Sequence, residues 1–347
     1  MRAVVLEKTG SAKLLKTKMI PRPENIDEEQ VIVKMAYAGI NYADILSRKG
    51  MYSWAPKRPF TLGLEGTGVI VEKGEKVEGY EIGDRVIVGT QSGTYAEYVK
   101  VHYSRVFPAF PNYSLKENAA VAGSYMTAMV ALREMGRVRG GETILVQAAA
   151  GALGMSTCQL AKAMGLKVAG TASRAEKIDF LREKIGIDLA INYTTQDFVQ
   201  EIRKWTGGKG VNVVLESVGG KVFQDSLRVL APTGRIVLVG ATSISYSKKN
   251  PLSLFRAWRQ IPRVNLLKAI RRSYGVLGFH LGWLLTNSRE ILTPIIEDLQ
   301  KIMVEHDIHP MIDTVYPLEL ASNAHQRIES RRNIGKVILA IDESVGS

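Results

Sequence analysis

The sequence predicts an α/β protein that combines a doubly wound parallel sheet with a second, β-rich domain. From Thr143 onward, short apolar runs typical of strands alternate with segments of helical spacing, which is the order of a doubly wound sheet. Before residue 126, short strand-like runs are instead divided by Gly, Pro and charged turns. At 347 residues the chain exceeds the usual size of a single core, so two domains are expected.

The first part of the chain is predicted to be mostly β. Its runs of apolar and β-branched residues are Arg2 to Glu7, Gln30 to Tyr37, Gly66 to Glu72, Arg85 to Val88 and Thr94 to Val101. A helix over Thr127 to Gly136 then leads to the second part.

The most informative stretch lies at residues 142–177. A buried strand over Thr143 to Gln147 enters a turn of small residues with the spacing G-x-G-x-x-G, in which Ala149 takes the first glycine place. A helix follows up to Gly165, and Lys167 to Thr171 forms a second strand. The alternative is an ordinary strand-turn-helix connection.

A turn of this kind suits a dinucleotide, because backbone N–H groups at a helix N-terminus contact a pyrophosphate only where side chains are small. The sequence therefore predicts a Rossmann-type dinucleotide site. The expected cofactor-binding residues of the turn are Ala150, Gly151, Ala152, Leu153 and Gly154.

The end of the second strand indicates which dinucleotide binds. An NAD site usually places a carboxylate about 20 residues beyond the glycines, to bind the ribose 2′-hydroxyl. No carboxylate stands at this strand end, where Ser173, Arg174 and Lys177 are suited to a 2′-phosphate. The pattern favours NADP(H) over NAD(H); the alternative for the two bases is a solvated helix start.

The second half continues as helices over 175–183, 195–205 and 220–230 and strands over 189–191, 211–216 and 235–240. Ligands of such a sheet bind beyond the carboxyl ends of its strands. Residues at these ends are Tyr193, Ser217, Val218, Gly240 and Ala241, whose alternative is plain connecting loops. A helix from Ser288, another over 318–329, and strands over 313–317 and 336–341 then return to the first domain. The expected domains are 1–125 with 288–347, and 126–287.

The net charge of +12 is concentrated in one region. No Asp or Glu occurs from Ser226 to Arg289, and eight bases fall between Lys248 and Arg272. The basic insertion at about 242–273 is open to four interpretations: a solvated helical insertion, a lid, a site for an acyl-CoA, or a surface for anionic membrane. No known nucleic-acid module is present, so nucleic acid is not an expected partner.

The single cysteine, Cys158, allows neither an intramolecular disulfide nor a cysteine cluster for metal. No apolar run approaches the length of a membrane span, and the N-terminus lacks the apolar region of a signal peptide. We therefore expect a cytoplasmic protein.

Several motifs, in order along nearly the whole chain, resemble the medium-chain dehydrogenase/reductase superfamily and its quinone oxidoreductase branch. They are Gly39-Ile40-Asn41-Tyr42-Ala43-Asp44, Gly63-Leu64-Glu65-Gly66-Thr67-Gly68, Gly83-Asp84-Arg85-Val86, the turn AAAGALG and Ile191-Asn192-Tyr193. Within that branch, three further motifs most resemble the vesicle amine transport protein homologues: Lys249-Asn250-Pro251-Leu252, Gly278-Phe279-His280-Leu281-Gly282 and Arg332-Asn333-Ile334-Gly335-Lys336-Val337.

The resemblance implies a Rossmann-type doubly wound parallel sheet plus a β-rich GroES-like catalytic domain. It places Asn41, Asp44 and Tyr52 towards nicotinamide and substrate, with Tyr52 polarising the substrate oxygen or relaying a proton. Alternatively, Asn41 and Asp44 only satisfy the backbone of a turn and Tyr52 only packs. The resemblance also places further residues at the cofactor: Tyr193 near the 2′-phosphate, Gly240, Ala241, Gly278, Phe279 and His280 near nicotinamide, and Asn333 and Lys336 near the phosphates. It implies a homodimer formed by edge strands.

Zinc is not expected. Zinc-dependent members of the resembling family carry Cys and His where this chain has Asn41 and Leu64, and Leu64 cannot ligate a metal. Two function classes therefore remain. One is a zinc-independent, NADPH-dependent reductase of a quinone or an α,β-unsaturated carbonyl compound such as an enoyl thioester. The other is an NADPH-binding, membrane-associated or regulatory protein with little turnover.

Overall fold

The computed structural model describes residues 1–243, 261 and 263–346 and divides the chain into two compact units. Unit 1 comprises Met1–Met126 and Leu281–Ser347, and unit 2 comprises Thr127–His280. The sequence placed these boundaries at 125/126 and 287/288. Several bases of the insertion lie outside the described residues, namely Lys248, Lys249, Arg256 and Arg259.

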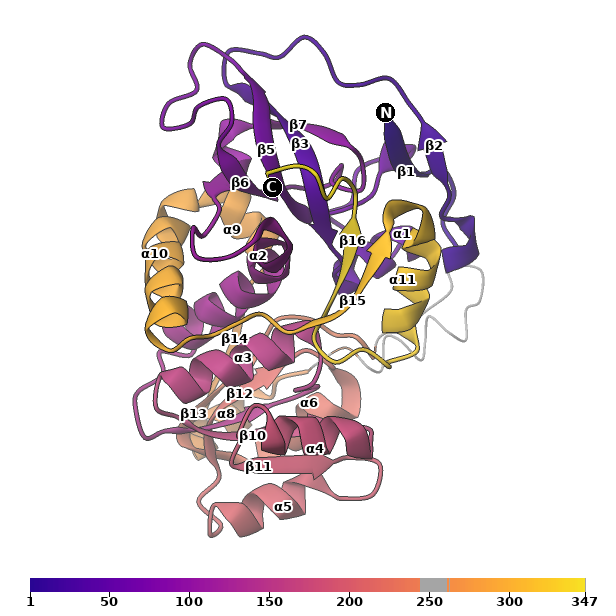
Figure 1. The fold of residues 1–347 in the computed structure, drawn as a ribbon. Coiled ribbons are helices and arrows are strands. Elements are labelled where there is room, and N and C mark those ends of the chain that lie inside the picture. The colour runs from indigo at the N-terminus through magenta and orange to yellow at the C-terminus, as the bar shows by residue number, and fades with distance from the viewer. Residues whose placement is uncertain (244–260, 262, 347) are drawn as a thin grey trace. The chain divides into compact units, whose positions relative to one another are not determined.

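Unit 1 is built on two sheets (Figure 1). The larger has seven strands in the order β15-β16-β3-β5-β6-β8, with β7 also paired to β3, and the smaller has the order β2-β1-β4. The strands are β1 (Arg2–Leu6), β2 (Thr17–Met19), β3 (Gln30–Gly39), β4 (Phe60–Thr61), β5 (Glu65–Lys73), β6 (Arg85–Gly89), β7 (Tyr98–His102), β8 (Val106–Pro108), β15 (Ile312–Pro317) and β16 (Lys336–Ala340).

Unit 1 also contains five helices among its described residues. They are α1 (Tyr42–Lys49), α2 (Leu115–Met129), α9 (Leu281–Asn287), α10 (Arg289–Glu305) and α11 (Ala321–Glu329), with short 3₁₀ turns at Ala12–Leu14, Tyr103–Arg105 and Leu318–Leu320. The core of unit 1 contains Val33 and Met35 of β3, Ile70 of β5 and Leu339 of β16.

Unit 2 has one parallel sheet of six strands in the order β11-β10-β9-β12-β13-β14. Its strands are β9 (Thr143–Val146), β10 (Lys167–Ala172), β11 (Leu189–Asn192), β12 (Val211–Glu216), β13 (Leu230–Leu238) and β14 (Gly275–Gly278). Its described helices are α3 (Ala152–Ala163), α4 (Ala175–Glu183), α5 (Phe198–Trp205), α6 (Gly220–Arg228) and α8 (Leu266–Arg272). A π-helix over Val130–Met135 follows α2.

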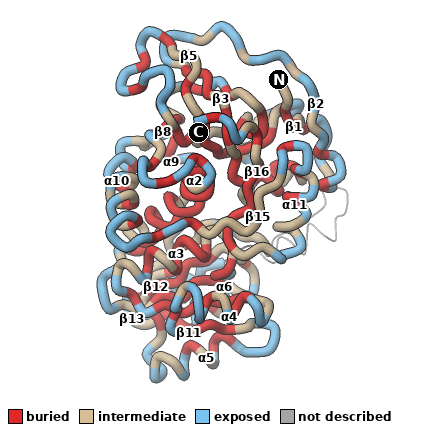
Figure 2. The backbone as a smooth tube through the Cα atoms, in the orientation of Figure 1, coloured by how far each residue is buried: buried red, intermediate tan, exposed pale blue. Residues whose placement is uncertain are grey.

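The central strands of unit 2 carry buried apolar runs, because helices pack on a doubly wound sheet from both sides. Leu145 of β9, Val214 of β12 and Ile236 of β13 are completely buried, and Figure 2 draws much of this sheet in the colour of buried residues. The predicted fold class is therefore confirmed.

Two helical segments differ from the sequence prediction. The helix predicted over Thr127 to Gly136 in fact begins at Leu115, and its last residues form the π-helix. Helix α1 was not predicted at all, although Asn41 precedes it and Gly50 ends it in a left-handed conformation with φ 72°. Short helices of this kind lie below the length at which apolar periodicity is detectable.

Candidate functional site

The end of β3 and the start of α1 bring two predicted catalytic residues together. Asn41 is the N-cap residue of α1, and its backbone N–H donates to Oδ2 of Asp44 at 2.7 Å. An acidic side chain three residues inside a helix satisfies a backbone N–H that the helix itself leaves unpaired. Asp44 therefore does satisfy the backbone of the turn and fixes that of Asn41, and whether it also takes part in catalysis stays a prediction.

Lys336 lies in this cluster, which was not foreseen. Its ammonium donates to Oδ1 of Asn41 at 2.8 Å and to Oε1 of Glu65, and Ser124 Oγ is 3.5 Å away. The side chains of Lys336 and Glu65 are only 2% and 4% exposed, so this ion pair is buried. Lys336 is therefore not a surface charge, and its contact with cofactor phosphate stays a prediction.

The sheet explains how Glu65 and Lys336 meet. Gly39 of β3 pairs with Glu65 of β5 on one side and with Ile338 of β16 on the other. The two charged side chains therefore approach each other across Gly39, whose lack of a side chain leaves the space open. The sequence could have drawn attention to Glu65, because it is a lone carboxylate among glycines in a β-rich motif. Its partner could not be found in this way, because Lys336 lies 271 residues further along the chain.

Asp44 is fully buried. Burial is the main reason that the pKa of its carboxyl group is raised to about 7; the charge of Glu65 adds to this rise, and the hydrogen bond from Asn41 and the charge of Lys336 oppose it. A carboxyl group with this pKa exchanges its proton near neutral pH, as groups in catalytic sites often do.

Tyr52 follows α1 and is partly buried. Its ring meets that of Trp54 edge to face, with ring centroids 6.4 Å apart. Burial, and then the charge of Asp44, raises the pKa of the Tyr52 hydroxyl. A phenol whose pKa is raised stays protonated at neutral pH and remains a hydrogen-bond donor.

The predicted dinucleotide turn lies between β9 and α3 of unit 2. Gly151 is the N-cap residue of α3, and no side chain caps the helix. A Cβ at Gly154 would lie 2.4 Å from the carbonyl oxygen of Ala148, so only glycine fits there. Ala150, Ala152 and Leu153 complete a turn whose helix N-terminus is covered by no side-chain cap. These features fit a bound pyrophosphate.

The segment after β10 contains Ser173, Arg174 and Lys177. Arg174 is 40% exposed and lies 3.4 Å from Glu176, whereas Lys177 is 6% exposed. The alternative of a solvated base is therefore wrong for Lys177. That these residues bind a 2′-phosphate stays a prediction.

Other predicted cofactor residues follow the carboxyl ends of strands of the same sheet. Tyr193 is 42% exposed after β11, and Ser217 and Val218 follow β12. Ser217 accepts from the N–H of Thr242 and Val218 accepts from that of Ser243, at 2.9 and 2.8 Å, so the turn after β12 is tied to the segment after β13. The remaining residues of this set are Gly240 and Ala241, which follow β13, and Gly278, Phe279 and His280, of which Gly278 ends β14 and the other two follow it.

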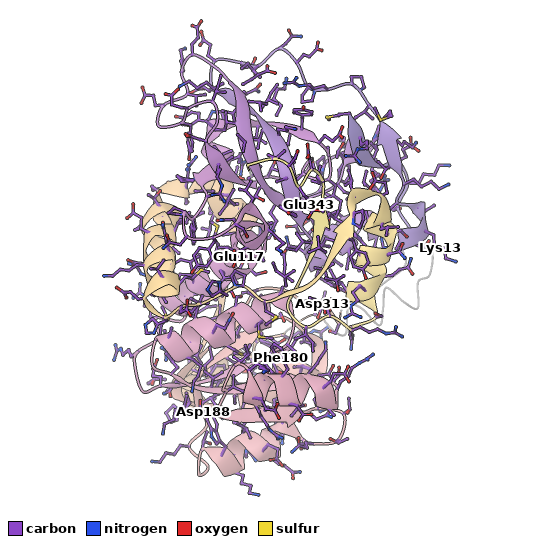
Figure 3. The ribbon with its side chains drawn as sticks, in the orientation of Figure 1. Lys13, Glu117, Phe180, Asp188, Asp313 and Glu343 are labelled. Carbon is purple, nitrogen blue, oxygen red and sulfur yellow. The ribbon has the colours of Figure 1, made fainter. Side chains whose placement is uncertain are left out.

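Asn333 precedes β16 in unit 1, and its side chain donates to the carbonyl of Gly335 at 2.9 Å. Asp313, labelled in Figure 3, holds the same loop by accepting from the N–H of Ile334 at 2.8 Å, and it is paired with Arg327. These contacts fix the loop that delivers Lys336 to the cluster. A phosphate contact for Asn333 stays a prediction.

Comparison with known proteins agrees with this architecture. Residues 27–112 match the model of the alcohol dehydrogenase GroES-like domain, and residues 152–275 match that of the zinc-binding dehydrogenase family. The rat synaptic vesicle membrane protein VAT-1 homolog is 34% identical over 98% of this chain and 84% of its own length. The chain belongs to the medium-chain dehydrogenase/reductase superfamily. Pig quinone oxidoreductase, of the same superfamily, is 31% identical over 98% of both chains.

Solved structures of the superfamily are similar to this chain over nearly all of its length. Escherichia coli quinone oxidoreductase complexed with NADPH is 28% identical, with a TM-score of 0.86, and covers 98% of this chain and 100% of its own. A mycobacterial protein complexed with NADPH is 27% identical, with a TM-score of 0.87 and the same coverage. The expected superfamily is therefore confirmed.

The name of the second family model implies zinc, and the residues of this chain do not fit it. Leu64 carries no ligand atom, and Oδ1 of Asn41 is engaged by Lys336. Among the described residues, no group of three or more His, Cys, Asp or Glu side chains could hold a metal ion. In the same part of the chain, no helix is long and apolar enough to cross a membrane.

Proposed function

We propose that this member of the superfamily is a zinc-independent, NADPH-dependent reductase that acts on a quinone or an α,β-unsaturated carbonyl compound. The observation that carries the proposal is the donor set of unit 1. Asn41 stands where zinc-dependent members would hold a metal. Its backbone N–H is bonded to Asp44, and its carboxamide oxygen is bonded to Lys336. The similarity to quinone oxidoreductases supports the same reaction class.

The chemistry of these side chains suits this reaction. When bound, NADPH supplies a hydride. Addition of hydride to an enone or quinone places negative charge on the substrate oxygen, and neutral donors aimed at that oxygen stabilise the charge. The carboxamide Nδ2 of Asn41 and the hydroxyl of Tyr52 are donors of this type, and Tyr52 also serves as a proton source.

Unit 2 supplies residues for the cofactor. The turn at Ala150–Gly154 would hold the pyrophosphate by backbone N–H groups, and Ser173 and Arg174 would bind the 2′-phosphate. Both E. coli quinone oxidoreductase and the mycobacterial protein are complexed with NADPH, which supports this cofactor over NADH.

The direct test is to measure NADPH oxidation by the purified protein from the fall in NADPH absorbance. The substrates offered in turn are ortho- and para-quinones, 2-alkenals and enoyl-CoA esters. We expect turnover with one of these classes and a preference for NADPH over NADH. Tight NADPH binding without turnover on any class would overturn the reductase proposal.

One observation favours a second candidate function, association with an anionic membrane surface. In α8, Leu266, Leu267 and Ile270 are 73%, 68% and 73% exposed, beside the bases Lys268, Arg271 and Arg272. Exposed apolar residues among bases are typical of interfacial helices. Sedimentation with phosphatidylserine liposomes tests this, and we expect binding that falls with added salt. Binding unchanged by charge reversal in α8 would contradict it.

The homodimer remains a prediction.

A further inference from the structure

The ammonium of Lys336 determines which way the carboxamide of Asn41 points. A lysine ammonium has three hydrogens and no acceptor, so the atom of Asn41 that faces it at 2.8 Å must be the oxygen Oδ1. The amide nitrogen Nδ2 then lies on the other branch of the side chain. We propose that Lys336 and Glu65 are positioning residues that hold Asn41 as a hydrogen-bond donor to the substrate oxygen. The inference rests on the proposed reductase function.

The ammonium has no hydrogen left for another partner. Its neighbours are Oε1 of Glu65, Oδ1 of Asn41 and Oγ of Ser124, which are three acceptors for three hydrogens. With its side chain 2% exposed, Lys336 cannot reach a cofactor phosphate without breaking this arrangement. Its function is therefore directed to Asn41.

The chain makes room for the ion pair on two sides. A Cβ at Gly39 of β3 would lie 2.5 Å from Oε1 of Glu65 and 2.9 Å from Cε of Lys336. A Cβ at Gly123 of α2 would lie 2.3 Å from Oε2 of Glu65. Two elements thus lack a side chain where this carboxylate sits, which is the arrangement of a built site.

Glu65 fixes where the ammonium of Lys336 lies. It accepts a hydrogen bond from that ammonium and sits beside it in the space left by Gly39. Without Glu65 the ammonium is not held against Oδ1 of Asn41, and the carboxamide can turn over. Oδ1 would then face the substrate oxygen and repel its developing charge. The ion pair thereby excludes the unproductive orientation.

The test is a double-mutant cycle. Glu65→Leu with Lys336→Met replaces the pair by apolar side chains, a change that buried ion pairs often tolerate. We expect kcat to fall about tenfold or more, with the Kd for NADPH within about twofold of wild type. Adding Asn41→Ala to this variant should cost little more, because both changes remove the same donor. Glu65→Gln alone keeps the shape and should lower kcat in the same direction.

A matched control removes the ion pair of Arg235 and Glu142 in unit 2, which joins the middle of β13 to the residue before β9. Arg235→Met with Glu142→Leu should leave kcat unchanged. Unchanged kcat in the Glu65 and Lys336 variants, additive losses with Asn41→Ala, or a large rise in the NADPH Kd would overturn the positioning function.

A second readout does not depend on turnover. In protein labelled with ¹⁵N at asparagine, the Asn41 carboxamide should give a shifted, sharp signal in wild type that moves towards solvent-exposed values in the double variant. A signal at the same position in the double variant would contradict the inference, even if the enzyme is active. A wild-type protein without turnover would contradict the proposed function, and this measurement would still be valid.

Discussion

The backbone N–H of Asn41 donates a hydrogen bond of 2.7 Å to Oδ2 of Asp44, three residues further along the chain. The carboxamide of the same Asn41 accepts from Lys336. One residue is therefore held at its backbone by a buried acid and at its side chain by a buried base. This double restraint is expected of a group whose direction matters to a reaction.

Asp44→Asn should change how stability depends on pH. The pKa of Asp44 is about 7 in the folded protein against an ordinary value of 3.8, so between these values the folded state binds the proton more tightly. Wild type should lose stability as the pH rises through this window, by up to about 4 kcal/mol at about 1.4 kcal/mol per pKa unit. Urea unfolding at several pH values measures this. A constant difference between wild type and Asp44→Asn would show that the pKa is not raised.

Tyr52→Phe should lower kcat by about tenfold or more, because the substrate oxygen loses a donor or proton source. The Kd for NADPH should stay close to that of wild type. Steady-state kinetics and a fluorescence titration measure the two quantities. Tyr316→Phe on β15 is a control that removes a different tyrosine hydroxyl, and equal kinetics in both variants would remove Tyr52 from the mechanism.

Arg174→Ala should raise the Kd for NADPH about tenfold or more and leave the Kd for NADH nearly unchanged, since only NADPH carries the 2′-phosphate. Arg174 suits this test because it is 40% exposed and its loss leaves no cavity. Titration with both cofactors measures the ratio. Equal losses for the two would mean that Arg174 does not bind the 2′-phosphate.

Gly154→Ala should weaken the binding of NADPH, and it should lower the free energy of unfolding by about 1–3 kcal/mol. The added Cβ would lie 2.4 Å from the carbonyl oxygen of Ala148, so the backbone of the turn must move. Gly140→Ala is the matched control, since its Cβ would come no closer than 3.8 Å to the carbonyl oxygen of Met164. Thermal unfolding with and without NADPH compares the two, and similar losses in both would contradict the expectation.

The parallel sheet was predictable because its signals are local. The strand at Val211–Glu216 and the helix at Ala175–Glu183 have the bounds expected from the sequence. The start of helix α2 was placed wrongly, although Ser114 and Glu117 have the spacing of a capping box and bond each other reciprocally. Residues 119–122 of α2 are buried all round, so the middle of this helix has no polar face and shows no amphipathic period.

The candidate site was predictable only in part. Asn41, Asp44 and Tyr52 lie close together in the sequence, and the resemblance to the superfamily identified them as candidates. The pairing of Lys336 with Glu65 joins residues that are 271 positions apart. It depends on the register of β16, β3 and β5, which no local pattern contains. Charged residues are also expected at the surface, so neither member suggested its own burial.

The pairing of β16 with β3 has a consequence for synthesis of the chain. Unit 2 is continuous from Thr127 to His280, whereas the seven-stranded sheet of unit 1 lacks β15 and β16 until the ribosome has passed residue 340. Unit 2 can fold while unit 1 still waits for its last strands, the reverse of the usual N-terminal-first order. Until then Glu65 has no counter-ion. Translation thus delivers Lys336 only after its partners Asn41 and Glu65.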